Sequence, residues 1–221
     1  MARNRIPMIK AAVMKVDCRQ PDESTIQEAI AVLQKGGLVV APTETRYGLL
    51  VRADWKKSLK KLYKIKKRPV TSPTALFVKA LEQIAEYGMM TPTARALAEA
   101  FLPGPLTLVL KALHQGEPPV VVEGKIGLRY SSSTVIKEIV DRLVFPVTAT
   151  SANKSGQPEF EQIDEIARSL GRGVDLYLDA GKLDNPVSTV VDCSGPGINV
   201  IREGFILKKN IDEILNKAGF I

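Results

Sequence analysis

Short apolar runs alternate with amphipathic stretches along most of this chain, and this alternation limits the possible folds more than any other feature. Residues 22–35 show the helical pattern, because apolar side chains recur at i, i+3, i+4 and i+7 from Ile26 until Gly36 and Gly37 interrupt it. The intervening apolar runs have the length of buried strands. We predict helices at 22–35, 55–66, 80–87, 92–101, 133–143, 162–170 and 210–218. We predict strands at 38–41, 47–51, 75–78, 106–110, 126–130, 146–150, 174–178, 187–192 and 198–202.

Alternating helices and strands predict a layered α/β fold. The last predicted strands, 187–192 and 198–202, follow one another without a helix between them, so we expect parallel and antiparallel pairs in one sheet. No internal repeat or linker divides the chain. We therefore expect an α/β fold with a single domain, residues 1–221, in which helices flank a twisted mixed parallel/antiparallel sheet.

The composition excludes two classes of protein. Hydrophobic residues make up 45% and charged residues 25% of the chain, unlike a disordered polypeptide. The longest stretches without Asp, Glu, Lys or Arg are 11 residues, at 100–110 and 143–153, whereas a membrane-spanning helix needs ~18 apolar residues.

Residues 1–17 include basic side chains but no continuous apolar segment after them. We interpret this N-terminus as the start of a mature cytoplasmic protein and not as a signal peptide.

Cysteine and histidine are too scarce for a His/Cys zinc site. Cys18 and Cys193 lie far apart, no C-x-x-C motif occurs, and the single histidine is His114. We expect both cysteines to be reduced and structural. His114 stands in a polar segment and is expected at the surface.

The positive charge of the chain is concentrated in one segment. The net charge is +7, but residues 55–81 contain nine basic residues and no acidic one, so the rest of the chain is slightly acidic. Such a segment is typical of a surface that attracts phosphates or nucleic acid. It is equally typical of a solvated helix face.

Several well-known catalytic motifs are absent. The sequence contains no G-x-x-x-x-G-K-[ST] phosphate loop, no G-x-G-x-x-G and no G-x-S-x-G. With one histidine, a Ser-His or Cys-His pair has little support. We therefore expect chemistry based on positioning and charge, with Lys, Arg, Ser, Thr and Asn as the working side chains.

Polar clusters follow the apolar runs, where α/β folds tend to bind ligands. Lys66 and Arg68 lie two residues apart before Pro69, so in an extended chain they would point in a similar direction and hold one polyanion. Together with neighbouring segments, these clusters form six ordered motifs. They are P-T-E-x-x-Y-G at 42–48, K-x-R at 66–68, P-G-P-x-T at 103–107, S-x-N at 151–153, S-T-V-V-D at 188–192 and R-x-G at 202–204.

In order and spacing, these motifs resemble the YrdC-like family, whose characterised members are threonylcarbamoyl-AMP synthases. The resemblance covers a core of about residues 25–206 and is to the single-domain form of the family, with a short C-terminal helix at 210–218. It implies a nucleotidyltransferase that makes L-threonylcarbamoyl-AMP and pyrophosphate from L-threonine, bicarbonate and ATP, with Mg²⁺. A second enzyme then transfers the threonylcarbamoyl group to tRNA. The alternative is a non-catalytic module that binds double-stranded RNA or tRNA through the basic segment 56–68.

The resemblance also implies roles for particular residues. The expected catalytic residues are Lys66, Arg68, Ser151 and Asn153. The expected amino-acid site consists of Thr45, Arg129 and Ser188, with Thr43 and Tyr47 as further candidates. The expected ATP contacts are Lys66, Arg68, Ser72, Asn153 and Arg202. We expect no metal site built from protein side chains alone.

The chain departs from the family pattern at three places. Phe77 stands where the family usually has a histidine, and Arg46 replaces a small apolar residue. Residues 159–161 are Glu-Phe-Glu instead of Ser-Pro-Thr. A sub-branch without settled activity lacks both K-x-R and S-x-N, whereas this chain has both.

Overall fold

The computed structural model describes residues 11–117 and 119–220. Most of the interpreted N-terminus, residues 1–10, lies outside the described residues. The helices are α1 (Glu23–Gln34), α2 (Lys56–Lys66), α3 (Leu81–Tyr87), α4 (Pro92–Phe101), α5 (Thr134–Asp141), α6 (Ile163–Leu170), the short 3-10 helix η1 (Gly171–Gly173) and α7 (Lys208–Lys217). The strands are β1 (Ala12–Lys15), β2 (Val39–Pro42), β3 (Tyr47–Leu50), β4 (Ala75–Phe77), β5 (Leu106–Lys111), β6 (Val121–Val122), β7 (Lys125–Arg129), β8 (Val147–Ser151), β9 (Leu176–Asp179), β10 (Thr189–Asp192) and β11 (Asn199–Arg202).

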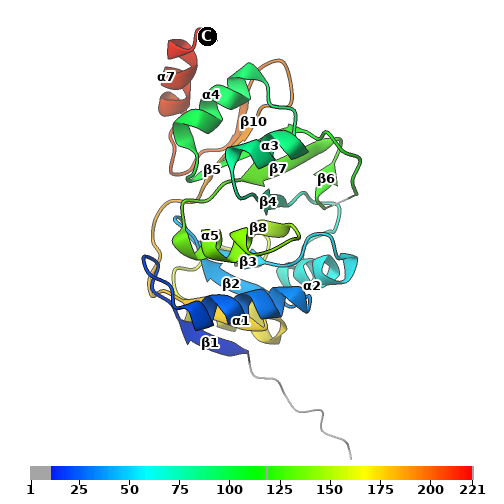
Figure 1. The fold of residues 1–221 in the computed structure, drawn as a ribbon, viewed down its shortest axis with the longest axis vertical. Helices are drawn as coiled ribbons and strands as arrows, with labels where there is room; N and C mark the ends of the chain where they lie inside the picture. The colour runs from blue at the N-terminus through cyan, green and yellow to red at the C-terminus, as the bar shows by residue number, and fades with distance from the viewer. Residues whose placement is uncertain (1–10, 118, 221) are drawn as a thin grey trace, which may run out of the picture.

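The strands form one long mixed sheet in the order β1-β9-β2-β3-β8-β4-β7-β5-β10-β11, with β6 paired to β7 (Figure 1). Four pairs are parallel: β1 with β9, β2 with β9, β4 with β7, and β5 with β10. The other pairs are antiparallel, and β8 joins the two halves of the sheet by pairing with β3 on one side and β4 on the other. The expected α/β class with a mixed sheet and flanking helices is confirmed.

The half of the sheet around β2 and β3 is covered by helices on both faces. Along β2, Val39 and Ala41 pack with α1 and α5, whereas Val40 packs with α2 and α6 on the opposite face. This follows from the period of two in a strand, which sends successive side chains to opposite faces. A strand that is buried on both faces consists of consecutive apolar residues. The sequence therefore predicted β2 and β3.

The half of the sheet around β5 and β7 has a helical layer on one face only. Leu106, Leu108 and Leu110 of β5 point into a core shared with α3, α4 and α7. The intervening Thr107 and Val109 point the other way and line a cavity. The alternation along these strands thus builds a core on one side and the floor of a site on the other.

All predicted helices and strands are found, each end within two residues of its expected position. β1 and β6 were not predicted. The side chains of β1 are mostly exposed, so this strand has no apolar signature, and its existence depends on parallel pairing with β9, over 160 residues away in sequence. No helix among the described residues has the length and hydropathy needed to cross a membrane.

Candidate functional site

A cavity of about 790 Å³ lies against the uncovered face of β4, β5, β7 and β10. Its remaining walls come from the β2–β3 turn, the end of α2, the end of β8 and the residues just before β10. The structure brings all but one of the predicted site residues into its lining: Thr43, Thr45, Tyr47, Lys66, Arg68, Arg129, Ser151, Asn153, Ser188 and Arg202. Ser72 is the exception among the described residues, and its carbonyl oxygen accepts a hydrogen bond from the Tyr63 hydroxyl at 2.6 Å.

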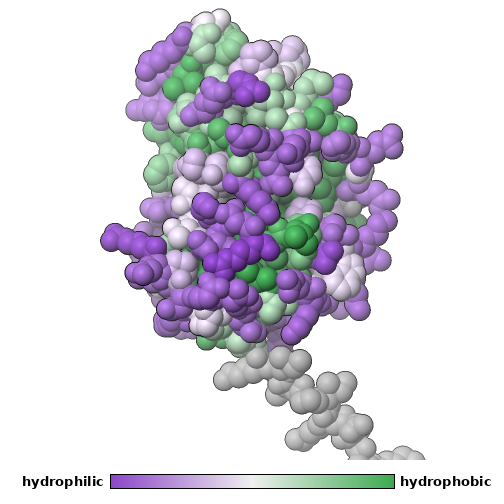
Figure 2. Space-filling view, in the orientation of Figure 1, coloured by the Kyte–Doolittle hydropathy of each residue, from purple (hydrophilic) through white to green (hydrophobic). Residues whose placement is uncertain are grey.

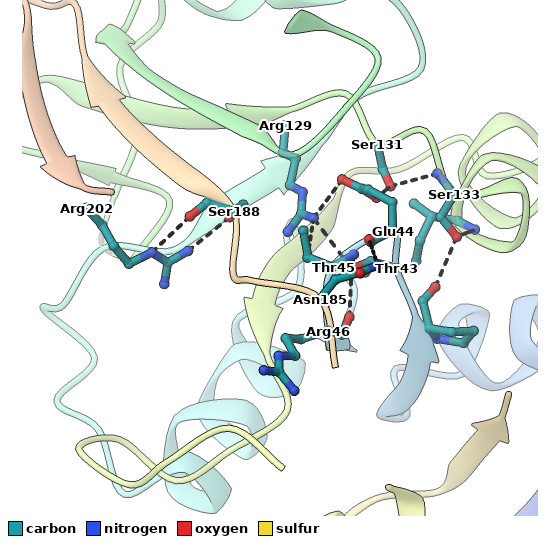
Figure 3. A network of polar contacts seen from close by, with 12 residues as sticks. Thr43, Glu44, Thr45, Arg46, Arg129, Ser131, Ser133, Asn185, Ser188 and Arg202 are labelled. Carbon is teal, nitrogen blue, oxygen red and sulfur yellow. Dashed lines mark hydrogen bonds and ion pairs between the residues drawn. The ribbon is translucent and has the colours of Figure 1, made fainter. Parts of the chain in front are cut away.

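One wall consists of two buried threonines and an arginine (Figure 3). The hydroxyls of Thr43 and Thr45 are hydrogen-bonded to each other at 2.9 Å, and the Thr43 hydroxyl lies 2.6 Å from the Arg46 carbonyl oxygen. Arg129 reaches them from β7 and donates from Nη2 to Thr45 Oγ1 at 2.9 Å. These bonds fix the hydroxyls and the guanidinium in one arrangement, as a site for a small polar ligand requires.

Glu44 orients this wall, and the sequence analysis did not select it. Its Oε1 accepts from Arg129 Nη2 at 2.8 Å, and Ser131 donates to its Oε2. The side chains of Arg129 and Glu44 are only 10% and 14% exposed. Ser133 supports the same turn by donating to the Pro42 carbonyl oxygen at 3.1 Å. A carboxylate in a turn usually lies in solvent, and only its buried arginine partner, 85 residues away in sequence, marks Glu44 as structural.

A second part of the lining contains Lys66 and Arg68. Lys66 is the last residue of α2, and Lys67 ends the helix with a φ of 51°, in the left-handed region that costs a non-glycine residue about 1–2 kcal/mol. Both Lys66 and Arg68 line the cavity, as predicted, although a left-handed turn achieves this instead of an extended chain. The Arg68 guanidinium lies 6.0 Å from the centre of the Tyr63 ring. No carboxylate among the described residues pairs with it, so it is available to an anionic ligand.

Lys66 connects the K-x-R and S-x-N motifs directly. Its Nζ donates to the carbonyl oxygens of Ser151 at 2.5 Å and Asn153 at 2.9 Å, and to Asn153 Oδ1 at 3.2 Å. Ser151 also donates to Asn153 Oδ1, at 2.6 Å. Burial, with a smaller contribution from the nearby charge of Arg68, lowers the pKa of Lys66 to about 8. Lys66 therefore positions the S-x-N turn and adds a positive charge close beneath the cavity wall.

Ser188 and Arg202 form a third part of the lining. Arg202 donates from Nε to the Ser188 carbonyl oxygen at 3.0 Å and from Nη2 to Ser188 Oγ at 2.9 Å (Figure 3). This close contact requires glycine at position 204, because a Cβ there would lie 2.1 Å from the Val187 carbonyl oxygen. The R-x-G motif thus combines an arginine that holds Ser188 with a glycine that permits the approach.

The three departures from the family pattern also lie at this site. Phe77 lines the cavity, with the Arg129 guanidinium 5.7 Å from its ring centre. Arg46 forms an ion pair with Glu161 at 2.9 Å. Glu159 lines the cavity, and its charge opposes the lowering of the pKa of Lys66.

The balance of charge in the lining favours an anionic ligand. Six basic and three acidic side chains line the cavity: Arg46, Lys66, Arg68, Lys125, Arg129 and Arg202, and Glu123, Glu159 and Asp192. No group of three His, Cys, Asp or Glu side chains suited to a metal ion occurs within the described part of the chain. Cys18 and Cys193 are free, and His114 is exposed as expected.

Comparisons with known proteins show the family of this chain. A protein of Methanocaldococcus jannaschii, provisionally named threonylcarbamoyl-AMP synthase, is 34% identical over 172 residues, 77% of this chain and 81% of that protein. The structure of Pyrococcus abyssi Sua5 complexed with L-threonine is similar with a TM-score of 0.82 and 27% identity, over 93% of this chain but only 61% of that one. Escherichia coli YciO is similar with a TM-score of 0.78 and 26% identity, over 89% of this chain and 96% of that one. The model of the family named for Sua5, YciO and YrdC, described as "Telomere recombination", matches residues 31–204. The chain belongs to the Sua5/YciO/YrdC family.

Proposed function

We propose that this chain makes L-threonylcarbamoyl-AMP from L-threonine, bicarbonate and ATP, and releases pyrophosphate. The product would pass to a second enzyme that modifies tRNA. One observation carries the proposal: the K-x-R and S-x-N motifs open onto the same cavity as Thr45, Arg129 and Ser188. The names of the M. jannaschii relative and of the threonine-bound Sua5 structure support it.

The reaction needs no protein nucleophile. The threonine amine and bicarbonate combine to a carbamate with loss of water. A carbamate oxygen then attacks the α-phosphorus of ATP, the bond from that phosphorus to the bridging oxygen breaks, and pyrophosphate leaves. The protein has to align the two substrates and stabilise negative charge on the phosphates. The cavity offers fixed hydrogen-bond donors and an excess of basic side chains for both tasks.

The amino-acid half would use the wall of Thr43, Thr45 and Arg129, completed by Ser188. An arginine with a fixed plane suits a carboxylate, and hydroxyls that both donate and accept suit an amino acid with a hydroxyl side chain. Phe77 lies beneath Arg129 and would limit the space for the substrate side chain.

The nucleotide half would use Arg68, Arg202 and the S-x-N turn. The guanidinium of Arg68 is free to bind phosphate oxygens. The ammonium group of Lys66 instead donates its hydrogen bonds to the S-x-N turn. We assign Lys66 an electrostatic and positioning role. Ser72 would reach a nucleotide only after the loop before β4 moves, because it lies outside the cavity lining.

Mg²⁺ would accompany the ATP. Of the three carboxylates in the lining, Glu159 is the one whose charge acts on both Lys66 and Arg202, where phosphates would lie. This fits the usual binding of Mg²⁺, through phosphate oxygens, water and one or two carboxylates. Bound there, the ion would neutralise phosphate charge, and Glu159 would be the protein residue that holds it.

Pyrophosphate release in the presence of threonine, bicarbonate and ATP tests the proposal. We expect release by the wild type and a loss of about 10²–10³-fold in Arg68→Ala, since a charge-stabilising donor would be removed. Lys64→Ala is the matched control, because it removes the same charge from an exposed position of α2. Full activity in Arg68→Ala would remove the assigned role of the K-x-R motif. No pyrophosphate with any amino acid would end the enzyme proposal.

RNA binding is the second candidate function. Six lysines of the basic segment are exposed on or just after α2: Lys56, Lys57, Lys60, Lys61, Lys64 and Lys67. Lysines in solvent can neutralise a nucleic acid backbone without base recognition. The enzyme remains the preferred proposal, because backbone binding makes no use of the buried hydroxyls in the cavity wall.

A further inference from the structure

The segment 180–188 crosses from β9, in one half of the sheet, to β10, in the other half. It contains no helix or strand, and its last residue is Ser188. We call it the strap. Val187 and Ser188 line the cavity, so the path of the strap determines the position of this part of the lining.

The β2–β3 turn and Tyr47, the first residue of β3, hold the strap at two positions. Tyr47 donates from its hydroxyl to the Gly181 carbonyl oxygen at 2.7 Å and accepts from the Ala180 amide at 3.0 Å. Asn185 donates from Nδ2 to the Glu44 carbonyl oxygen at 3.0 Å (Figure 3). The same turn thus contributes the Thr45 hydroxyl to the cavity and holds the strap.

Arg46 and Glu161 hold the middle of the strap. Arg46 Nη1 donates to the Leu183 carbonyl oxygen at 2.8 Å and lies 2.9 Å from Glu161 Oε1. The Leu183 amide in turn donates to the Glu161 carbonyl oxygen at 2.9 Å. Lys182 of the strap lies 3.2 Å from Glu161 Oε2. Both backbone groups of Leu183 are therefore bonded to these two residues, which we call the clasp.

A segment without regular structure keeps its place only through such contacts. The clasp holds Leu183, five residues before Ser188, and no strand or helix lies between Leu183 and Ser188. Arg202 and the start of β10 hold Ser188 from the other side, so the clasp fixes the remaining end of this stretch. The Arg46 and Glu161 side chains are 19% and 35% exposed, so their pairing is partly shielded from water. Glu161 itself is absent from the cavity lining, so its influence on a ligand would be indirect.

We propose that Arg46 and Glu161 are positioning residues that set the place of Ser188 opposite Thr45, and so the fit of the amino-acid substrate. The inference rests on the proposed function for the identity of that substrate. The clasp makes no contact with the reacting atoms in this role. Its loss weakens binding of the amino acid more than binding of ATP, because Ser188 belongs to the amino-acid wall, whereas within the described residues Arg202 is the one assigned nucleotide residue that is hydrogen-bonded to the strap.

Glu161→Gln tests the inference, since it keeps the size of the side chain, removes its charge and leaves the cavity lining intact. We expect the KM for threonine to rise about tenfold and the KM for ATP to change less than about twofold. Hydrogen exchange at the Leu183 amide should become faster. Arg46→Lys, which keeps the charge but lacks the planar fork, should fall between the wild type and Arg46→Met in both measurements.

Glu99→Gln is the control, because both side chains of the Arg95–Glu99 pair on α4 are exposed, at 60% and 61%. An unchanged rate of hydrogen exchange at the Leu183 amide in Glu161→Gln would show that the clasp does not hold the strap. Faster exchange with an unchanged KM for threonine, or an equal rise of both KM values, would overturn the positioning role. If the wild type releases no pyrophosphate with any amino acid, the proposed function fails, and the positioning role fails with it. The exchange measurement would still decide whether the clasp holds the strap.

Discussion

Lys66 is a buried basic residue that forms no ion pair with a carboxylate among the described residues. Its ammonium group is stabilised by two carbonyl oxygens and an amide oxygen, and by its place at the C-terminal end of α2, where the helix dipole favours a cation. Burial lowers its pKa to about 8, and the nearby charge of Glu159 opposes this lowering. A triphosphate in the cavity would supply the missing negative charge.

Proton uptake on ATP binding is therefore a prediction for Lys66. In the free protein its pKa of about 8 leaves Lys66 largely neutral above this pH. Bound phosphates raise the pKa, so binding at a pH of roughly 8.5–9 takes up part of a proton, whereas binding near pH 6.5 takes up none at this residue. Calorimetry in buffers with different ionisation enthalpies measures the uptake. Equal uptake by the wild type and a folded Lys66→Met variant would contradict this account.

Glu44→Gln should destabilise the protein. The substitution leaves the Arg129 guanidinium buried without its carboxylate, which typically costs about 3–5 kcal/mol. We expect the free energy of unfolding in urea to fall by about this amount, while the exposed-pair control Glu99→Gln changes it by less than about 1 kcal/mol. A loss in Glu44→Gln no larger than in the control would show that Glu44 does not support this wall.

At the scale of elements, the uncovered face of β4, β5, β7 and β10 creates the site. The apolar runs predicted these strands, since their Leu and Ile residues alternate into the core beneath α3, α4 and α7. The runs could not show which face lacks helices, because that depends on the strand order. For the same reason, the sequence could not predict that Glu44 pairs with Arg129 or that the clasp holds the strap. Each joins residues more than 80 positions apart.

The approach of the segment after β11 to the start of β10 leads to a paired prediction. Gly204→Ala would place a Cβ 2.1 Å from the Val187 carbonyl oxygen, and backbone can relieve such a contact only by moving. We expect a loss of about 1–3 kcal/mol in the free energy of unfolding. Gly197→Ala is the control, because a Cβ there has no atom within 4 Å. Equal stability of the two variants would contradict the close approach.

At the scale of the whole molecule, the side chains of the basic segment divide between two environments. Lys66 and Arg68 face the cavity, while the other lysines of α2 face solvent, on a molecule whose face in Figure 2 is mostly hydrophilic. The sequence predicted the segment and its final pair. It could not separate the buried lysine from the exposed ones, because that separation is made by the left-handed turn at Lys67 and the contacts of α2 with the S-x-N turn.

This separation predicts that RNA binding and catalysis can be uncoupled. Replacing Lys56, Lys57, Lys60 and Lys61 by Gln should weaken any RNA binding and reduce its dependence on salt, because fewer phosphate contacts remain. Pyrophosphate release should stay within about twofold of the wild type, since these side chains lie outside the cavity lining. Filter binding at several salt concentrations measures the first effect. No RNA binding by the wild type at low salt would end the second candidate function.

Identification of the product is the sharpest test of the proposed reaction. The purified protein is incubated with ATP, Mg²⁺, L-threonine and isotopically labelled bicarbonate, and the nucleotides are analysed by mass spectrometry. The account predicts threonylcarbamoyl-AMP that contains the labelled carbon, formed in equal amount with pyrophosphate and lost when threonine is omitted. Absence of any labelled aminoacylcarbamoyl-AMP, with threonine or with every other amino acid, would contradict it.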